Sequence, residues 1–319
     1  MNHSTSELHR PVMLERCLEL LRPALLGNNP VVIDCTLGLG GHTEALLLEN
    51  PTLRVIGIDR DPKAIELASK RLEQFGDRFI PAFGVYDEIE EILEELSIEF
   101  VDGILMDLGV SSMQLDLAER GFSYAQDAEL DMRMDQTRGK TAADLLATLS
   151  EEELTRIFRK YGEERFSAPI ARKIVSTREL SEIRTSKDLN KIVSSCVPQA
   201  PGKTAGHPAK RIYQALRIAV NDELMVLERS LPQAIAALRP GGRLVVMSYH
   251  SLEDGIVKEA LQSAATSSTP IEMSIELPGT GAVLKIITKG VERATEFELD
   301  QNPRAASARL RAAEKLEAK

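Results

Sequence analysis

The sequence predicts an α/β fold with a mostly parallel sheet and an inserted helical domain. Three observations support this prediction: short apolar runs alternate with amphipathic stretches in the first third of the chain, only helical segments follow, and the alternation returns near residue 240. Strands that alternate with helices form parallel βαβ units. We therefore expect one discontinuous domain, residues 1–110 and 209–319, interrupted by a helical domain over 111–208.

The first third of the chain contains four predicted strands. These strands are expected over residues 31–33, 53–58, 78–83 and 101–106, and helices over 44–49, from Pro62 and over 87–96. Asp61-Pro62 is typical of a helix start, because the N–H that Pro lacks would be unbonded at the first helical position anyway. The strands are almost continuously apolar, which indicates a sheet that is buried on both faces.

The rest of the chain is predicted to be helical first and then α/β again. Residues 111–139 are rich in Met, Asp and Gly and show no strong period. Ser150 and Glu153 have the spacing of a capping box, which marks the start of a helix. Further helices are expected over 167–178, 186–197 and 209–229, a connector over 198–208, strands over 243–248, 271–275 and 283–288, and a last helix from Ala305.

Composition indicates an intracellular protein. The chain has 319 residues, of which 43% are hydrophobic, and no run of eighteen apolar residues that could span a membrane. The first ten residues lack the layout of a signal peptide. Its three cysteines are far apart and have neither disulfide-framework nor zinc spacing. We expect a cytoplasmic protein with no metal and no membrane partner, while its oligomeric state stays open.

Charge is distributed unevenly along the chain. The formal net charge is −10, yet residues 155–217 contain fourteen Lys and Arg against five Asp and Glu. A basic block inside an acidic protein is expected of a localised phosphate-binding face. The alternative, a set of solvated helix faces, stays open at this point.

A glycine-rich turn follows the first predicted strand. Residues 34–42 read DCTLGLGGH, and glycines spaced in this way let the backbone approach a ligand closely. A side chain at Gly40 would then occupy the space of that ligand. Dinucleotide sites need a third glycine where this chain has Thr43. Asp59 ends the second strand, where a carboxylate can accept hydrogen bonds from ribose hydroxyls. S-adenosylmethionine is therefore favoured over NAD.

Motifs along nearly the whole chain resemble the ribosomal RNA small-subunit methyltransferase H family, also called MraW. The glycine loop alone occurs in many nucleotide-binding proteins, but DLGVSSMQLD, LDMRMD and HSLED together are highly specific for this family. The chain departs from the family at Gly255, where the family usually has Arg. The motifs are HRPVM (9–13), GGH (40–42), IDRDP (58–62), DLGVSSMQLD (107–116), RGFS (120–123), LDMRMD (130–135), HPA (207–209), QALRI (214–218), HSLED (250–254), NPRA (302–305) and LR (310–311).

The resemblance implies a fold, a reaction and a set of site residues. It implies a Rossmann-like class I methyltransferase sheet that binds S-adenosylmethionine, and an inserted domain that recognises RNA. The implied reaction is methylation of the N4 amine of a cytosine in the decoding centre of 16S ribosomal RNA, within the small ribosomal subunit. The implied cofactor contacts are Gly40, Gly41, His42, Asp59, Asp107, Gln114 and an aromatic residue, Tyr86, with Phe83 as the alternative.

Chemistry selects a catalytic candidate among these residues. Methyl transfer from a sulfonium is an in-line displacement, so the enzyme has to align the amine and accept its hydrogens. Asp107 ends the fourth strand, at the edge where open α/β sheets bind ligands. It is our catalytic candidate, and orientation of the methionine part of the cofactor is its alternative role. The substrate candidates are Asp131, Arg133, Arg211 and His250.

Bland readings of the same residues stay open. Ser251 and Asp254 have capping-box spacing for the helix that follows the fifth strand. LDMRMD could be a loop that packs its methionines and solvates its charges. Arg211 and Arg217 could bind phosphate, stack on a base or lie on an ordinary helix surface.

Rival functions also stay open. A methyltransferase that acts on DNA or on a small molecule would share this cofactor site. A non-catalytic RNA-binding or assembly factor could have kept the fold, although the intact glycine loop and Asp59 argue against it. An NAD-dependent oxidoreductase is disfavoured by Thr43. The sequence identifies no general base.

Overall fold

A computed structural model describes residues 11–198, 207–269 and 279–317. The chain divides into two compact units, which we call the sheet unit (residues 1–109 and 224–319) and the helical unit (residues 110–223). The second junction thus lies after Glu223, whereas the sequence predicted it at Pro208. The reason is α10 (Lys210–Asn221), which buries Ile212 and Leu216 in the core of the helical unit.

The described residues of the sheet unit form a seven-stranded sheet in the order β3-β2-β1-β4-β5-β7-β6. Strands β1 to β5 are parallel, and β7 runs antiparallel to both of its neighbours. The predicted Rossmann-like class I sheet is confirmed. Chain order reverses between β1 and β4, which is where open α/β sheets bind ligands. The strands are β1 (Val31–Asp34), β2 (Arg54–Asp59), β3 (Phe79–Phe83), β4 (Val101–Asp107), β5 (Leu238–Ser248), β6 (Leu284–Ile286) and β7 (Arg309–Lys315).

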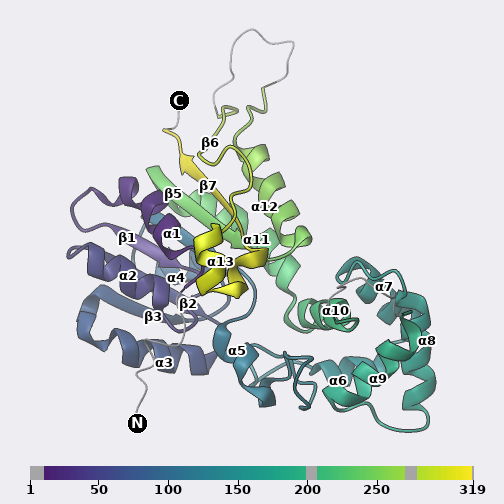
Figure 1. Ribbon diagram of the computed structural model, residues 1–319. Helices are drawn as coiled ribbons and strands as arrows, with labels where there is room; N and C mark the ends of the chain where they lie inside the picture. The colour runs from purple at the N-terminus through teal and green to yellow at the C-terminus, as the bar shows by residue number, and fades with distance from the viewer. Residues whose placement is uncertain (1–10, 199–206, 270–278, 318–319) are drawn as a thin grey trace. The chain divides into compact units, whose positions relative to one another are not determined.

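Helices cover both faces of this sheet (Figure 1). Along β5, Val245 and Met247 enter one core and Leu244 and Val246 the other, as the two-residue period of a strand requires. The first core lies under α1 (Leu14–Leu21), α2 (Gly41–Glu49) and α3 (Pro62–Leu72), and the second under α4 (Ile89–Glu95), α11 (Glu223–Ala237) and α12 (Ser251–Ala264). The remaining elements of the unit are η1 (Arg22–Leu25), η2 (Glu73–Arg78), α13 (Glu296–Gln301) and η4 (Pro303–Ser307).

The last strand corrects a sequence prediction. A helix was expected from Ala305, because Ala, Leu, Lys and Glu favour helices intrinsically. The chain instead forms β7, which hydrogen-bonds β5 on one side and β6 on the other. Leu310 and Ala312 enter the first core and Ala313 the second, so burial on two faces outweighs local propensity. The strand expected over 271–275 lies outside the described residues.

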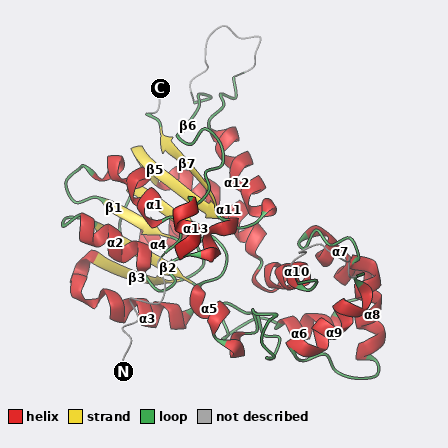
Figure 2. Ribbon diagram, viewed as in Figure 1, coloured by secondary structure: helices red, strands yellow, loops and turns green. Residues whose placement is uncertain are grey.

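The described residues of the helical unit form helices and loops (Figure 2). These pack around an apolar core of their own. Thr141, Ser150 and Thr185 begin three of its helices with capping boxes, and the one predicted at Ser150 is confirmed. No helix in the described part of the chain is long and apolar enough to cross a membrane. The elements of the unit are α5 (Ser112–Asp116), η3 (Ala118–Arg120), α6 (Ala142–Thr148), α7 (Glu151–Lys160), α8 (Ser167–Arg178), α9 (Ser186–Cys196) and α10.

The helix predicted over 209–229 is two helices. Asp222 separates α10 from α11 and has a left-handed backbone, with φ at 55°. Aspartate tolerates this conformation better than most residues. Arg217 and Glu223 form a bidentate ion pair across the break, with two contacts of 2.9 Å, and their side chains are only 16% and 8% exposed. Arg217 is therefore engaged within the fold and not presented to phosphate.

We predict that Arg217→Ala lowers the free energy of unfolding by about 3–5 kcal/mol, because it leaves the Glu223 carboxylate buried without its guanidinium. Denaturant unfolding measures this change. Lys210→Ala removes an exposed cation from the same helix and is expected to change stability by less than about 0.5 kcal/mol. Equal stabilities of the two variants would contradict a structural role for the ion pair.

Candidate cofactor and acceptor site

The glycine loop joins β1 to α2 and is bonded to β2. Gly38 and Gly40 have left-handed backbones, with φ at 52° and 75°. The N–H of Leu37 donates to the carbonyl of Ile58 at 2.9 Å, and the N–H of Gly38 donates to Oδ2 of Asp59 at 2.8 Å. The loop is therefore shaped by the end of β2 before any ligand binds.

The neighbours of Gly40 and Gly41 correct the reason we gave for these glycines. A Cβ at Gly40 would lie 3.0 Å from Leu72 Cδ1 and 3.4 Å from Ala68 Cβ, so it would point at α3 and not into ligand space. A Cβ at Gly41 would lie 2.5 Å from Pro11 Cγ. Both glycines allow close packing, and Gly40 also allows a left-handed turn. Their contact with cofactor remains a prediction.

Asp59 has a fixed carboxylate at the end of β2. Oδ2 accepts from Gly38, and Oδ1 accepts from the N–H of Asp61 at 2.9 Å. Burial raises the pKa of Asp59 to about 6, although both backbone hydrogen bonds oppose the rise. Each oxygen keeps a free lone pair. These suit the two hydroxyl donors of a ribose, so Asp59 fits the nucleoside part of S-adenosylmethionine.

A buried polar frame that sequence reasoning missed lies beneath the loop. The hydroxyl of Thr43 donates to Asp34 Oδ2 at 2.7 Å, and the N–H of Thr36 donates to Asp34 Oδ1 at 3.2 Å. The Thr36 hydroxyl oxygen accepts from the N–H of Asp107 at 2.7 Å. Thr43, which replaces the third glycine of a dinucleotide site, thus helps to join the ends of β1 and β4. Burial raises the pKa of Asp34.

Asp107 lies at the carboxyl end of β4 with its two oxygens in different surroundings. The hydroxyl of Tyr249 donates to Oδ1 at 2.6 Å, while Oδ2 lies 3.9 Å from Nδ1 of His42. Burial raises the pKa of Asp107 to about 7, against the opposing effect of the Tyr249 hydrogen bond. Sequence reasoning missed Tyr249. The available signal was its place two residues after Met247, which pairs with Asp107 in the sheet.

His42 begins α2 and is buried beside this carboxylate. Its Nε2 lies 3.1 Å from the carbonyl oxygen of Val12, and burial lowers the pKa of the ring. A neutral ring that donates from Nε2 has a bare lone pair at Nδ1. Asp107 and His42 therefore offer two acceptors, which fit an ammonium or amine group.

Two aromatic residues lie at and just after the end of β3, the strand that pairs with β2. Phe83 ends β3 opposite Asp59 in register and is 56% exposed. Tyr86 is half-buried and packs against the second core. The N–H of Gly84 donates to the carbonyl of Asp59 at 3.1 Å, so both aromatics lie on a segment bonded to the ribose carboxylate. Contact of Tyr86 with cofactor remains a prediction.

His250 has a structural role that corrects the predicted cap. Nδ1 accepts from the N–H of Glu253 at 3.4 Å, and Glu253 returns a bond to the N–H of His250, so the capping box begins at His250 and not at Ser251. Asp254 instead forms a bidentate ion pair with Arg311, at 2.7 and 3.2 Å. His250 is only 9% exposed, and its expected contact with substrate stays a prediction.

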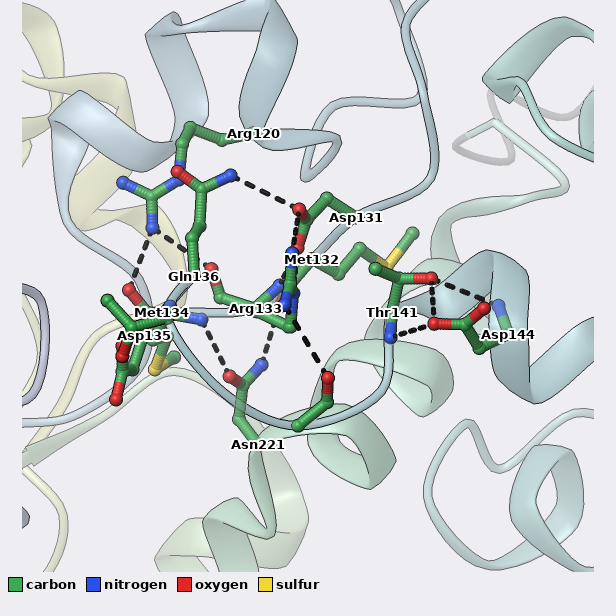
Figure 3. Close-up of polar contacts among 12 residues, drawn as sticks. Arg120, Asp131, Met132, Arg133, Met134, Asp135, Gln136, Thr141, Asp144 and Asn221 are labelled. Carbon is green, nitrogen blue, oxygen red and sulfur yellow. Dashed lines mark hydrogen bonds and ion pairs between the residues drawn. The ribbon is translucent and has the colours of Figure 1, made fainter.

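Asp131 and Arg133 lie in the helical unit and bind each other (Figure 3). Arg133 donates from Nε to Asp131 Oδ1 at 2.8 Å and from Nη2 to Oδ2 at 2.9 Å. Burial raises the pKa of Asp131, but the Arg133 hydrogen bonds outweigh it and the pKa is lowered. The charges of this loop are thus ion-paired and not simply solvated.

Figure 3 also shows that side chains hold the backbone of this loop. Asn221 donates to the carbonyl of Met132 at 2.7 Å and accepts from the N–H of Met134 at 2.8 Å. Arg120 donates to the carbonyls of Arg133 and Met134 at 3.0 and 2.8 Å. Both methionines are buried. The packing that we considered for these methionines is therefore confirmed, and the substrate contacts of Asp131 and Arg133 stay predictions.

The last two candidates also lie in the helical unit. Gln114 is buried, and its Oε1 accepts from the N–H of Ser111 at 3.0 Å in the capping box of α5. Arg211 is exposed and donates to the carbonyl of Glu163 at 3.2 Å. Their ligand contacts stay predictions. Among the described residues, no group of three or more His, Cys, Asp or Glu side chains could hold a metal ion.

We predict that Asp59→Ala weakens S-adenosylmethionine binding by about 1.5–3 kcal/mol, because the variant has no charged acceptor for the hydroxyl donors. In the unmodified protein, affinity is expected to weaken as pH falls through about 6, where Asp59 takes up a proton. Calorimetry at several pH values measures both effects. Asp77→Ala removes an exposed carboxylate of the same unit as the control. Unchanged affinity in Asp59→Ala would rule out the ribose contact.

Curated relatives match the chain along almost its full length. One is the ribosomal RNA small subunit methyltransferase H of Beutenbergia cavernae, which is 55% identical over 97% of this chain and 93% of that protein. The protein of the same name from Pseudarthrobacter chlorophenolicus is 54% identical over 99% of this chain and 97% of that protein. Among solved structures, an rRNA methylase from Streptococcus thermophilus is 12% identical, covers 97% of this chain and 99% of its own, and has a TM-score of 0.43.

The family assignment agrees with the site. Two acceptors that suit ribose hydroxyls lie at the carboxyl end of β2, as the nucleoside part of S-adenosylmethionine requires. The model of the MraW methylase family matches residues 6–316. The chain therefore belongs to the MraW methylase family and is an S-adenosylmethionine-dependent methyltransferase.

Proposed function

We propose that the protein methylates the N4 amine of a cytosine in the decoding centre of 16S ribosomal RNA, in the cytoplasm and within the small ribosomal subunit. The names of the curated relatives support ribosomal RNA of the small subunit as the substrate. The observation that supports an amine acceptor is the Asp107 carboxylate, which has one oxygen bonded by Tyr249 and the other directed at no hydrogen-bond donor that the described residues show.

In this reaction the protein forms no covalent bond with the substrate and has to align the reacting groups. The cofactor supplies a methyl group on a sulfonium. The exocyclic amine of cytosine is a poor nucleophile, since its lone pair is delocalised into the ring. The N–CH3 bond forms as the S–CH3 bond breaks, and the surplus proton of the nitrogen leaves to solvent. Asp107 Oδ2 accepts a hydrogen bond from the amine, which favours a pyramidal nitrogen and stabilises the positive charge that develops on it. The frame around Thr36 fixes the backbone of Asp107, so this acceptor is oriented before the substrate arrives.

RNA contact is assigned to exposed cations of the helical unit. Arg178 in α8 is not one of these RNA-binding candidates, because it donates to the carbonyls of Leu146 and Leu149 at 2.7 and 2.6 Å and so caps α6. Lys187 and Lys191 are exposed, and together with Tyr124 they line a hollow of about 400 Å³. Cations next to an aromatic side chain suit single-stranded RNA, whose bases stack and whose phosphates need counter-charges.

We predict that Asp107→Asn lowers kcat by about 10²–10³-fold, because the amide presents a donor or a weaker acceptor to the amine. The assay uses small subunits that lack the methyl group, with mass spectrometry of the nucleosides. N4-methylcytidine is the expected product, and free DNA is the matched alternative substrate. Transfer to DNA with equal efficiency, or a different methylated nucleoside, would contradict the proposal.

A triple variant tests the helical unit. Lys173, Lys187 and Lys191 are exposed, and no ion pair of theirs is seen among the described residues. Replacing all three by Ala is expected to weaken RNA binding and to flatten its salt dependence by about 0.7–0.9 for each phosphate that no longer has a lysine partner. S-adenosylmethionine affinity is expected to stay unchanged. The control replaces Lys70, Lys285 and Lys289 of the sheet unit, and an equal weakening there would mean that only net charge matters.

A further inference from the structure

The structure gives the Asp107 carboxylate one side-chain hydrogen-bond donor. This donor is the hydroxyl of Tyr249, 2.6 Å from Oδ1, and the described residues provide no second one. Burial raises the pKa of Tyr249 well above its usual value, so its proton stays on the hydroxyl. The oxygen Oδ1 is therefore occupied, and Oδ2 is the oxygen left for a ligand.

Tyr249 is itself fixed by its neighbours. Its N–H donates to Glu253 Oε2 at 2.8 Å, and its ring packs against the first core. Gly109 has φ at 96°, and a Cβ there would lie 3.6 Å from the Tyr249 ring. Both residues follow neighbouring strands, since Asp107 on β4 pairs with Met247 on β5. The pairing of β4 with β5 therefore sets the position of the Tyr249 hydroxyl next to Asp107.

The free oxygen faces another acceptor. Nδ1 of His42 lies 3.9 Å from Oδ2, and it has a lone pair because Nε2 donates to Val12. Two acceptor lone pairs at this distance do not stabilise each other, and a hydrogen-bond donor placed between them can bond to both. If Asp107 took up a proton on Oδ2, that oxygen would present a donor to the amine in place of a charged acceptor. Keeping Asp107 ionised is therefore a requirement of the site.

We propose that Tyr249 is a positioning residue for methyl transfer, whose hydroxyl keeps Asp107 in the ionised form in which Oδ2 accepts the N–H of the substrate amine. This inference rests on the proposed function of Asp107. It adds a specific task for a residue that contacts the reacting amine only through another side chain.

Other titratable groups near Asp107 do not perform this task. His42 on α2 is neutral at neutral pH, and Glu253 on α12 raises the pKa of Asp107 by its negative charge. Asp34 at the end of β1 is a further acid, and burial keeps the Cys17 thiol on α1 protonated by raising its pKa. Among these groups, the Tyr249 hydroxyl is the one that favours the ionised carboxylate.

The test is the pH profile of kcat/KM for undermethylated small subunits in Tyr249→Phe. The unmodified enzyme is expected to lose activity as pH falls through about 7, where the Asp107 of the free enzyme takes up a proton. Without the hydroxyl, this midpoint is expected to rise by about one pH unit, since a hydrogen bond to a charged group has about that effect. The deficit is then about tenfold at pH 6 and disappears near pH 9.

Tyr213→Phe is the matched control. It removes another buried hydroxyl, which donates to the carbonyl of Ser186 at 3.4 Å in the helical unit, and its profile is expected to keep the midpoint of the unmodified enzyme. Tyr249→Leu serves as a second variant, in which the same shift is expected together with lower thermal stability, because the ring no longer fills its place in the first core.

The outcomes separate the two proposals. A deficit in Tyr249→Phe that is the same at every pH would overturn the positioning role and leave a packing role. An unmodified enzyme with no loss of activity near pH 7, together with full activity in Asp107→Asn, would instead remove Asp107 as the amine acceptor. A shifted midpoint in Tyr249→Phe but not in Tyr213→Phe supports the inference.

Discussion

Three carboxylates at the carboxyl ends of β1, β2 and β4, of which Asp34 is buried and Asp59 and Asp107 are half-buried, organise the edge of the sheet on which the site depends. Asp34 binds the hydroxyl of Thr43, Asp59 binds the glycine loop, and Asp107 is bonded to Thr36 through its backbone and to Tyr249 through its side chain. Carboxylates that lose part or all of their contact with water are costly unless they are hydrogen-bonded. The loops that satisfy them are therefore fixed, which orients the acceptors before ligands bind.

The helical unit follows the same rule with different partners. Its LDMRMD segment is irregular backbone, yet Asn221 and Arg120 bond to its peptide groups and Asp131 pairs with Arg133. Irregular backbone can be this well defined only where side chains replace the missing helix or strand hydrogen bonds. Motif residues can thus serve the shape of a unit, and the exposed cations of α8 and α9 are better candidates for RNA contact.

Sequence reasoning succeeded where local pattern decides structure. The parallel strands, the capping box at Ser150 and the place of Asp59 at the end of β2 follow from periodicity and spacing. It failed at β7, which has a helix-favouring composition but pairs with strands that are distant in sequence. It also failed at Asp222, where one left-handed residue interrupts a helical pattern. Tyr249 was missed because its value comes from sheet register with Asp107, which no single motif displays.

In the proposed reaction, Asp107 Oδ2 is the acceptor for the amine that receives the methyl group. A crystal structure of the protein with S-adenosylhomocysteine and cytidine measures this directly. We expect the cytidine N4 within hydrogen-bond distance of Oδ2, with the Tyr249 hydroxyl still on Oδ1. An Asp107 carboxylate that contacts only the amino group of the cofactor, with N4 bonded elsewhere, would contradict it.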